Sequence, residues 1–293
     1  MGIIGIDIGG TNFRIGLVDG RGEVADFRKV PVKQVFFTPD PLADLSGYLK
    51  AYCEGKTVEA VSIGFPATVD RERKTVLQAP NVPFVERLPV VEVLAKELGI
   101  PVFIERDVTL ALAYDCRKHG IPDDGIVCGF YFGTGIGNAI SINGVPLIGK
   151  NGTAGELGHI PVDGSEEVCG CGNVGCMEPL AGGRYLAQLC REVYTDTHIS
   201  NLFTKHSCEP LLQQFVDRMA ITVATEINIL DPDWVLIGGG VPAMENFPRE
   251  YLVERIRFHA RKPFPAETLE VIFTEDEEDK TVQGAALYAA SKR

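Results

Sequence analysis

No stretch of about 18 apolar residues occurs in this chain, so we expect no segment that spans a membrane. The start, Met1-Gly2-Ile3-Ile4, also lacks the basic region that opens a secretory signal. Positive charge is scarce, because 28 lysines and arginines stand against 40 aspartates and glutamates, a net charge of -12. A nucleic-acid surface needs clustered positive charge. These absences predict a cytoplasmic protein with neither a membrane nor a nucleic acid as its partner.

The chain also lacks the small size of a disulfide-stabilised secreted protein, although it contains eight cysteines. We therefore expect reduced thiols. Five of them are scattered and are predicted to have no special role: Cys53, Cys116, Cys128, Cys190 and Cys208. The other three, Cys169, Cys171 and Cys176, fall within eight residues of one another. A length of 293 residues predicts about two domains.

Two similar hairpins are predicted in corresponding places. The first is a strand from Ile4, a turn at Gly9-Gly10-Thr11-Asn12 and a second strand through Leu17. The second hairpin turns at Gly133-Thr134-Gly135-Ile136-Gly137. At one constant offset Gly5 aligns with Gly129 and Gly9 with Gly133, which indicates a duplicated unit; chance similarity is the alternative.

Both turns could bind phosphate, because glycine lets a ligand approach the backbone and consecutive N–H groups attract anions. Asp7 would repel a phosphate unless a divalent cation lies between them, which suggests Mg²⁺. The alternative is an ordinary hairpin turn. No Gly-Lys-Ser/Thr follows, so this is not a Walker A loop. Gly238-Gly239-Gly240, after a buried strand, would accommodate adenine and ribose, or else form only a tight turn.

Glu105-Arg106-Asp107 lies where a strand is predicted to give way to a helix. A carboxylate at a helix start is often only a cap. In its functional interpretation Asp107 is a general base that takes a proton from an attacking hydroxyl.

The clustered cysteines follow His159 by ten residues or more. Three thiols and one imidazole match a tetrahedral zinc site with Cys169, Cys171, Cys176 and His159 as ligands, and with four protein ligands the zinc would be structural. Glu178 is the less favoured fourth ligand. The metal would fix a loop that presents Glu156 to a polar ligand such as a sugar hydroxyl.

Together these motifs resemble the ROK family of sugar kinases over essentially the whole chain. The resemblance rests on Asp7 to Asn12, Gly64-Phe65-Pro66, Asp107, Gly133 to Gly137, Glu156-Leu157-Gly158-His159, the cysteine cluster and Gly238 to Gly240. It implies an α/β, actin-like ATPase (ribonuclease H-like) fold, with two α/β domains around a nucleotide and sugar cleft. The expected domains are residues 1–117 plus 281–293, and residues 118–280.

The resemblance further implies ATP with Mg²⁺ as the phosphate donor and the 6-hydroxyl of a hexose as the acceptor. It makes Asp107 the catalytic base and places Glu156 and His159 on the sugar, with His159 also on zinc. Pro66 and Asn81, in Pro80-Asn81-Val82-Pro83, fall at sugar-side positions. A homodimer is expected.

One departure concerns specificity. Most family glucokinases have Glu-Asn-Asp before the catalytic helix, whereas Arg106 replaces the sugar-binding Asn here. Arg106 and the neighbouring motifs resemble the D-allose kinase branch. The alternatives are a glucokinase or another hexose or N-acetylhexosamine kinase, and a non-catalytic sugar-sensing protein. Repressor relatives carry a winged helix ahead of the sugar domain, for which a hairpin starting at residue 4 leaves no room.

Overall fold

The structure is a computed structural model that describes residues 1–293. The chain forms two compact units: residues 1–121, 148–154 and 277–293, and residues 122–147 and 155–276. The chain thus passes from one unit to the other at four points. None of the helices combines the length and apolar character that crossing a lipid bilayer requires.

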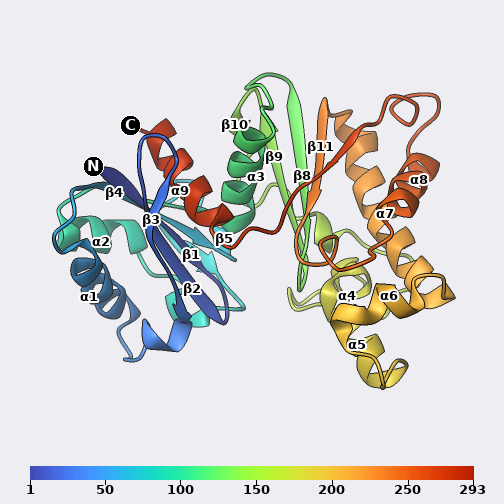
Figure 1. The fold of residues 1–293 in the computed structure, drawn as a ribbon, viewed down its shortest axis with the longest axis horizontal. Helices are drawn as coiled ribbons and strands as arrows, with labels where there is room; N and C mark the ends of the chain where they lie inside the picture. The colour runs from blue at the N-terminus through green and yellow to red at the C-terminus, as the bar shows by residue number, and fades with distance from the viewer. The chain divides into compact units, whose positions relative to one another are not determined.

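The first unit is a five-stranded sheet with helices on both faces (Figure 1). Its strands lie in the order β3-β2-β1-β4-β7, and β1, β4 and β7 are parallel. Its elements are β1 (Gly2–Ile8), β2 (Asn12–Val18), β3 (Val24–Pro31), α1 (Pro41–Cys53), β4 (Val58–Phe65), β5 (Thr68–Val69), β6 (Val76–Gln78), α2 (Val90–Leu98), β7 (Val102–Arg106), α3 (Asp107–Lys118), α9 (Lys280–Ser291) and the 3₁₀ turns Val32–Gln34 and Pro83–Val85.

Residues alternate along β1 between the two faces of this sheet. Ile4, Ile6 and Ile8 are fully buried in the core that includes α1 and α2. Gly5 faces the opposite way, where a Cβ would lie 2.0 Å from the carbonyl oxygen of Val282. The missing side chain therefore lets α9 pack directly against β1, so that the C-terminus joins the unit that contains the N-terminus (Figure 1).

The second unit repeats this topology. Its five strands lie in the order β10-β9-β8-β11-β12, and β8, β11 and β12 are parallel. Its elements are β8 (Ile126–Phe132), β9 (Ile136–Ile142), β10 (Val145–Pro146), α4 (Glu178–Ala181), α5 (Gly183–Glu192), α6 (Leu202–His206), α7 (Pro210–Leu230), β11 (Trp234–Gly238), α8 (Arg249–His259), β12 (Val271–Phe273) and the 3₁₀ turns Leu157–His159 and Ile199–Asn201. Two sheets of matching topology confirm the actin-like α/β fold and the duplicated hairpin.

The observed units differ from the expected domains in one instructive place. Residues 148–154 were expected in the second domain, but they pack on the first unit. They do so because arginines of the first unit bind their backbone carbonyls: Arg73 donates to the Gly152 oxygen and Arg106 to the Ala154 oxygen. The other boundaries move by only a few residues, to Ile121 and Glu277.

Candidate functional site

The predicted site residues of the first unit gather at one edge of its sheet. Asp7 on β1 is paired in register with Gly64 on β4, and Gly64 with Glu105 on β7. Because the three strands are parallel, the residues that follow them emerge at the same carboxyl edge. The Gly9–Asn12 turn, Pro66 and Asp107 therefore lie along this one edge.

The first glycine turn connects β1 to β2. The N–H of Gly9 donates to the carbonyl oxygen of Asn12 at 2.8 Å, whereas Gly10 and Thr11 are exposed. A Cβ on Gly10 would lie 3.2 Å from the carbonyl oxygen of Asn81. The structure thus places Asn81, a residue about 70 positions away in the chain, directly beside the turn.

Asp7 has a partner that the sequence did not reveal. Its Oδ2 accepts a hydrogen bond from Arg14, the residue opposite it on β2, at 2.8 Å. Burial raises the pKa of the Asp7 carboxyl, and the charge of Arg14 opposes that rise. A carboxylate at a strand end beside a glycine turn is a suitable oxygen ligand for Mg²⁺, either directly or through water. A bound divalent cation would further favour the ionised form of Asp7.

Asp107 is the first residue of α3 and is half-buried. Its Oδ1 accepts a hydrogen bond from the N–H of Val108 at 2.8 Å. The positive end of the helix dipole also favours a negative charge at this place. The carboxylate is therefore oriented by the helix that it begins, while being near enough to the surface to meet a substrate.

The second glycine turn joins β8 to β9, where the N–H of Gly133 donates to the carbonyl oxygen of Gly135 at 3.0 Å. Glu178, the alternative zinc ligand, is engaged here instead: its Oε2 accepts from the N–H of Ile136 at 2.9 Å. A Cβ on Gly135 would lie 2.3 Å from that oxygen. Gly183, at the start of α5, donates its N–H to the Gly133 carbonyl. The sequence did not predict the hydrogen bonds of Glu178 and Gly183 to this turn.

The Gly238–Gly240 segment lies at the corresponding edge of the second sheet, because Gly238 on β11 is paired with Tyr131 on β8. Gly239 has φ +94°, and a Cβ there would lie 2.7 Å from the Phe132 carbonyl oxygen. The nearest atom to a Cβ on Gly240 would be 3.9 Å away. Gly240 is exposed, and exposed backbone without a side chain is suited to a flat ring such as adenine.

The four predicted zinc ligands come together. One ligand atom from each of His159, Cys169, Cys171 and Cys176 lies within 4.8 Å of the others. The sulfurs of Cys171 and Cys176 are 3.7 Å apart, and the Cys169 sulfur is 3.5 Å from His159 Nδ1. Zinc–sulfur bonds of about 2.3 Å in a tetrahedron place two sulfurs about 3.7 Å apart. The arrangement therefore fits a tetrahedral zinc ion, and none of the eight cysteines forms a disulfide.

His159 connects this cluster to Glu156. While Nδ1 faces Cys169, Nε2 lies 3.6 Å from the Glu156 carboxylate. A metal-bound imidazole commonly has a carboxylate near its other nitrogen, and such a pair orients both side chains. Fixing His159 would therefore also restrict Glu156, which is half-buried at the start of the 3₁₀ turn Leu157–His159.

Residues 3–292, nearly the whole chain, match the family model described as "ROK family". The chain belongs to the ROK family. This ROK protein is 30% identical to a glucokinase of Thermotoga maritima, and the alignment covers 97% of this chain and 96% of the relative. It is also 30% identical to an N-acetylmannosamine kinase of Salmonella typhi over 90% of each chain.

A solved structure gives the same result. A ROK family glucokinase from Streptomyces griseus, in complex with glucose and AMPPNP, superposes with a TM-score of 0.77 at 27% identity. The match covers 99% of this chain and all of that chain. The expectation of a ROK protein is thereby confirmed.

Proposed function

We propose that this ROK protein is an ATP-dependent hexose kinase that transfers the γ-phosphate of ATP to the 6-hydroxyl of a hexose. The observation that carries the proposal is the sheet edge of the first unit, where Asp107 lies with the first glycine turn and Asp7. Phosphoryl transfer requires a positioned hydroxyl, a base to accept its proton and neutral or cationic groups around the phosphates. Asp107 would accept that proton, and Asp7 would hold Mg²⁺.

The remaining roles follow the same logic. The turns at Gly9–Asn12 and Gly133–Gly137 would bind phosphate oxygens through backbone N–H groups, and Gly238–Gly240 would bind the adenosine. Glu156 and His159 would contact sugar hydroxyls, as would Asn81 and Pro66. These neutral turns, together with Mg²⁺, explain how a protein of net charge -12 could bind ATP.

The relatives favour the broader substrate prediction over D-allose. Those described above are named for glucose and for N-acetylmannosamine. We therefore propose a glucokinase or another hexose or N-acetylhexosamine kinase as the main function. D-Allose remains the specific candidate suggested by Arg106, where the chain departs from the family glucokinase pattern.

The decisive assay couples ADP formation to a spectroscopic signal for glucose, allose, mannose, fructose, N-acetylmannosamine and N-acetylglucosamine. We expect sugar-dependent ADP formation with at least one of them. The absence of ADP with every sugar would favour a non-catalytic sugar-sensing protein instead.

Replacing Arg106 with Asn should change the ratio of kcat/KM for glucose to kcat/KM for allose. We expect a change of about tenfold or more, because even one methylene group in a substrate pocket changes discrimination by about 10- to 200-fold. The ratio is the useful quantity because any general loss of activity affects both sugars alike. Arg71→Asn, at an exposed arginine, is the matched control. An unchanged ratio would show that Arg106 does not read the sugar.

A further inference from the structure

The segment Ile148–Ala154, here called the strap, belongs to the first unit although the chain on either side of it belongs to the second. The strap ends one residue before Gly155, which has φ +79°, and two residues before Glu156. Whatever fixes the strap therefore fixes the backbone that leads into a proposed sugar-binding residue.

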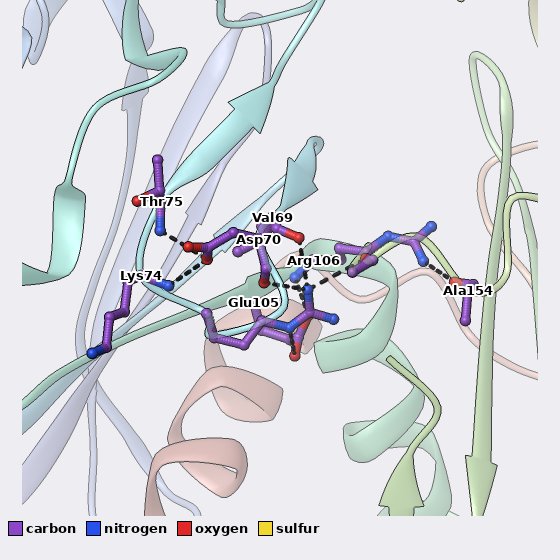
Figure 2. A network of polar contacts seen from close by, with 9 residues as sticks. Val69, Asp70, Lys74, Thr75, Glu105, Arg106 and Ala154 are labelled. Carbon is purple, nitrogen blue, oxygen red and sulfur yellow. Dashed lines mark hydrogen bonds and ion pairs between the residues drawn. The ribbon is translucent and has the colours of Figure 1, made fainter. Parts of the chain in front are cut away.

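Two arginines of the first unit hold the strap by its carbonyl groups. Arg106 donates from Nη1 to the Ala154 oxygen at 2.6 Å, which Figure 2 shows as the contact that links β7 to the strap. An asparagine at position 106 would be too short to reach this oxygen. Arg73 donates from Nη1 to the Gly152 oxygen at 3.3 Å. The strap is thus bound at two of its last three residues.

Arg73 also binds β7, the strand that ends immediately before the proposed base, Asp107. Its Nε donates to Glu105 Oε2 at 2.9 Å, and Glu105 is fully buried. The other oxygen of Glu105 accepts from the N–H of Arg106 at 2.8 Å, immediately before Asp107 (Figure 2). Burial and the Glu105 charge together raise the pKa of Tyr288 on α9, which keeps that phenol protonated beside the carboxylate.

The backbone around Arg73 has an unusual conformation that directs this side chain toward Glu105 and the strap. Arg73 has φ +55°, a left-handed conformation that is uncommon for arginine. Asp70 stabilises the turn, since its Oδ1 accepts from the N–H groups of Lys74 and Thr75 at 2.6 and 3.0 Å (Figure 2). The Arg73 guanidinium also donates to the carbonyl oxygens of Val69 and Asp70. This left-handed backbone places a partly buried cation among four acceptors, which are the carbonyl oxygens of Val69, Asp70 and Gly152 and the carboxylate of Glu105.

We propose that Arg73 is a positioning residue for the hexose. Its guanidinium binds both the strap and the Glu105 carboxylate. The same side chain therefore restrains the backbone that precedes Asp107 and the backbone that precedes Glu156. Arg73 itself does not react. This inference rests on the proposed hexose kinase function, because the two residues that it positions are the proposed base and a proposed sugar ligand.

Arg73→Lys tests the inference without leaving a buried charge unpaired. Lysine keeps the ion pair with Glu105, but a single ammonium cannot also bind the separate carbonyl groups that the planar guanidinium reaches. We expect KM for the hexose to rise about tenfold or more, as small displacements of substrate-binding groups commonly do, while KM for ATP stays within about twofold. Arg71→Lys, the same change at an exposed side chain of the same turn, should alter neither value.

Gly152→Ala tests the strap with no change of charge. A Cβ on Gly152 would lie 2.1 Å from the Val69 carbonyl oxygen, and the residue has φ +79°, so the strap must move away. The same selective rise in hexose KM is expected. Gly47→Ala is the matched control, because a Cβ at that helical glycine meets no atom within 4 Å.

Hydrogen exchange separates this inference from the proposed function. In Arg73→Lys and Gly152→Ala, the amides of residues 148–155 should exchange faster than in the parent protein, whereas those of α7 should not change. Unaltered exchange in the strap would overturn the inference, and so would a normal hexose KM in both variants of an active enzyme. If the parent protein phosphorylates no hexose, the proposed function fails and with it the positioning of a hexose, even where exchange shows the strap to be held by Arg73.

Discussion

Replacing Asp107 with Asn should lower kcat for hexose phosphorylation by about two to four orders of magnitude, the contribution that a general base usually makes. Asparagine has nearly the same shape and can accept the hydrogen bond that the Val108 N–H now donates to Asp107. It cannot accept the proton of a sugar hydroxyl. The variant should therefore fold and bind ATP but turn over very slowly.

Steady-state kinetics, thermal unfolding and nucleotide binding together check this expectation. Loss of a negative charge at the start of α3 should cost no more than about 2 kcal/mol of stability, the upper end of what the helix dipole contributes at a partly buried site. Asp124→Asn, at an exposed aspartate in a loop of the second unit, is the control and should be silent. Near-normal kcat in Asp107→Asn would remove Asp107 from the base role.

Replacing Cys176 with Ser should release the zinc that we expect to copurify at about one ion per chain. Four ligand atoms within 4.8 Å leave room for one tetrahedral ion and for little else. The loop around them contains no regular helix or strand, and backbone hydrogen bonds within the loop, together with short bridges that pair Pro161 with Cys176 and Val168 with Val174, hold it. Without metal the glycine-rich backbone gains conformational freedom, and the order of the loop is lost.

The effect should reach the sugar through His159. Because Glu156 lies 3.6 Å from His159 Nε2, loss of the metal frees both side chains, and we expect kcat/KM for the hexose to fall by about 100-fold. Elemental analysis and steady-state kinetics measure the two consequences separately. Cys208→Ser, at an exposed cysteine outside the cluster, should keep both zinc and activity. Freshly purified parent protein that contains no zinc would contradict the assignment of the cluster.

Much of the fold could be predicted because it depends on local patterns. The strand Val58–Phe65 and the helices Val90–Leu98 and Pro210–Leu230 each lie in one continuous segment that is rich in apolar residues. The spacing of apolar residues that distinguishes a strand from a helix can be recognised within a short run of consecutive residues. The glycines that end helices, such as Gly99 with φ +68°, are local signals as well. The two glycine hairpins were visible for the same reason.

Helix α1 and the small hairpin of β5 and β6 were not predicted. Asp40 caps α1 by accepting from the N–H of Ala43, a signal that is present in the sequence, and Pro41 begins the helix. The β5–β6 hairpin has only short strands, and its turn is held by Asp70 rather than by glycine. Short elements carry too few residues for periodicity to distinguish them from loops.

The sequence by itself determined the family, the fold class and the chemistry of the candidate groups, because each depends on residue types at close spacing. His159 and the three cysteines lie in one short stretch, and so do the residues of each glycine turn. Only the tertiary structure decided how distant segments meet: Asn81 beside Gly10, Glu178 at the second turn rather than at the cysteines, and Arg73 on Glu105 and the strap. The physical reason is that a buried charge or a buried backbone N–H or C=O group needs a hydrogen-bond or ion-pair partner, and any suitable group that packing brings close can serve. The spacing of residues along the chain therefore does not predict which partner it will be.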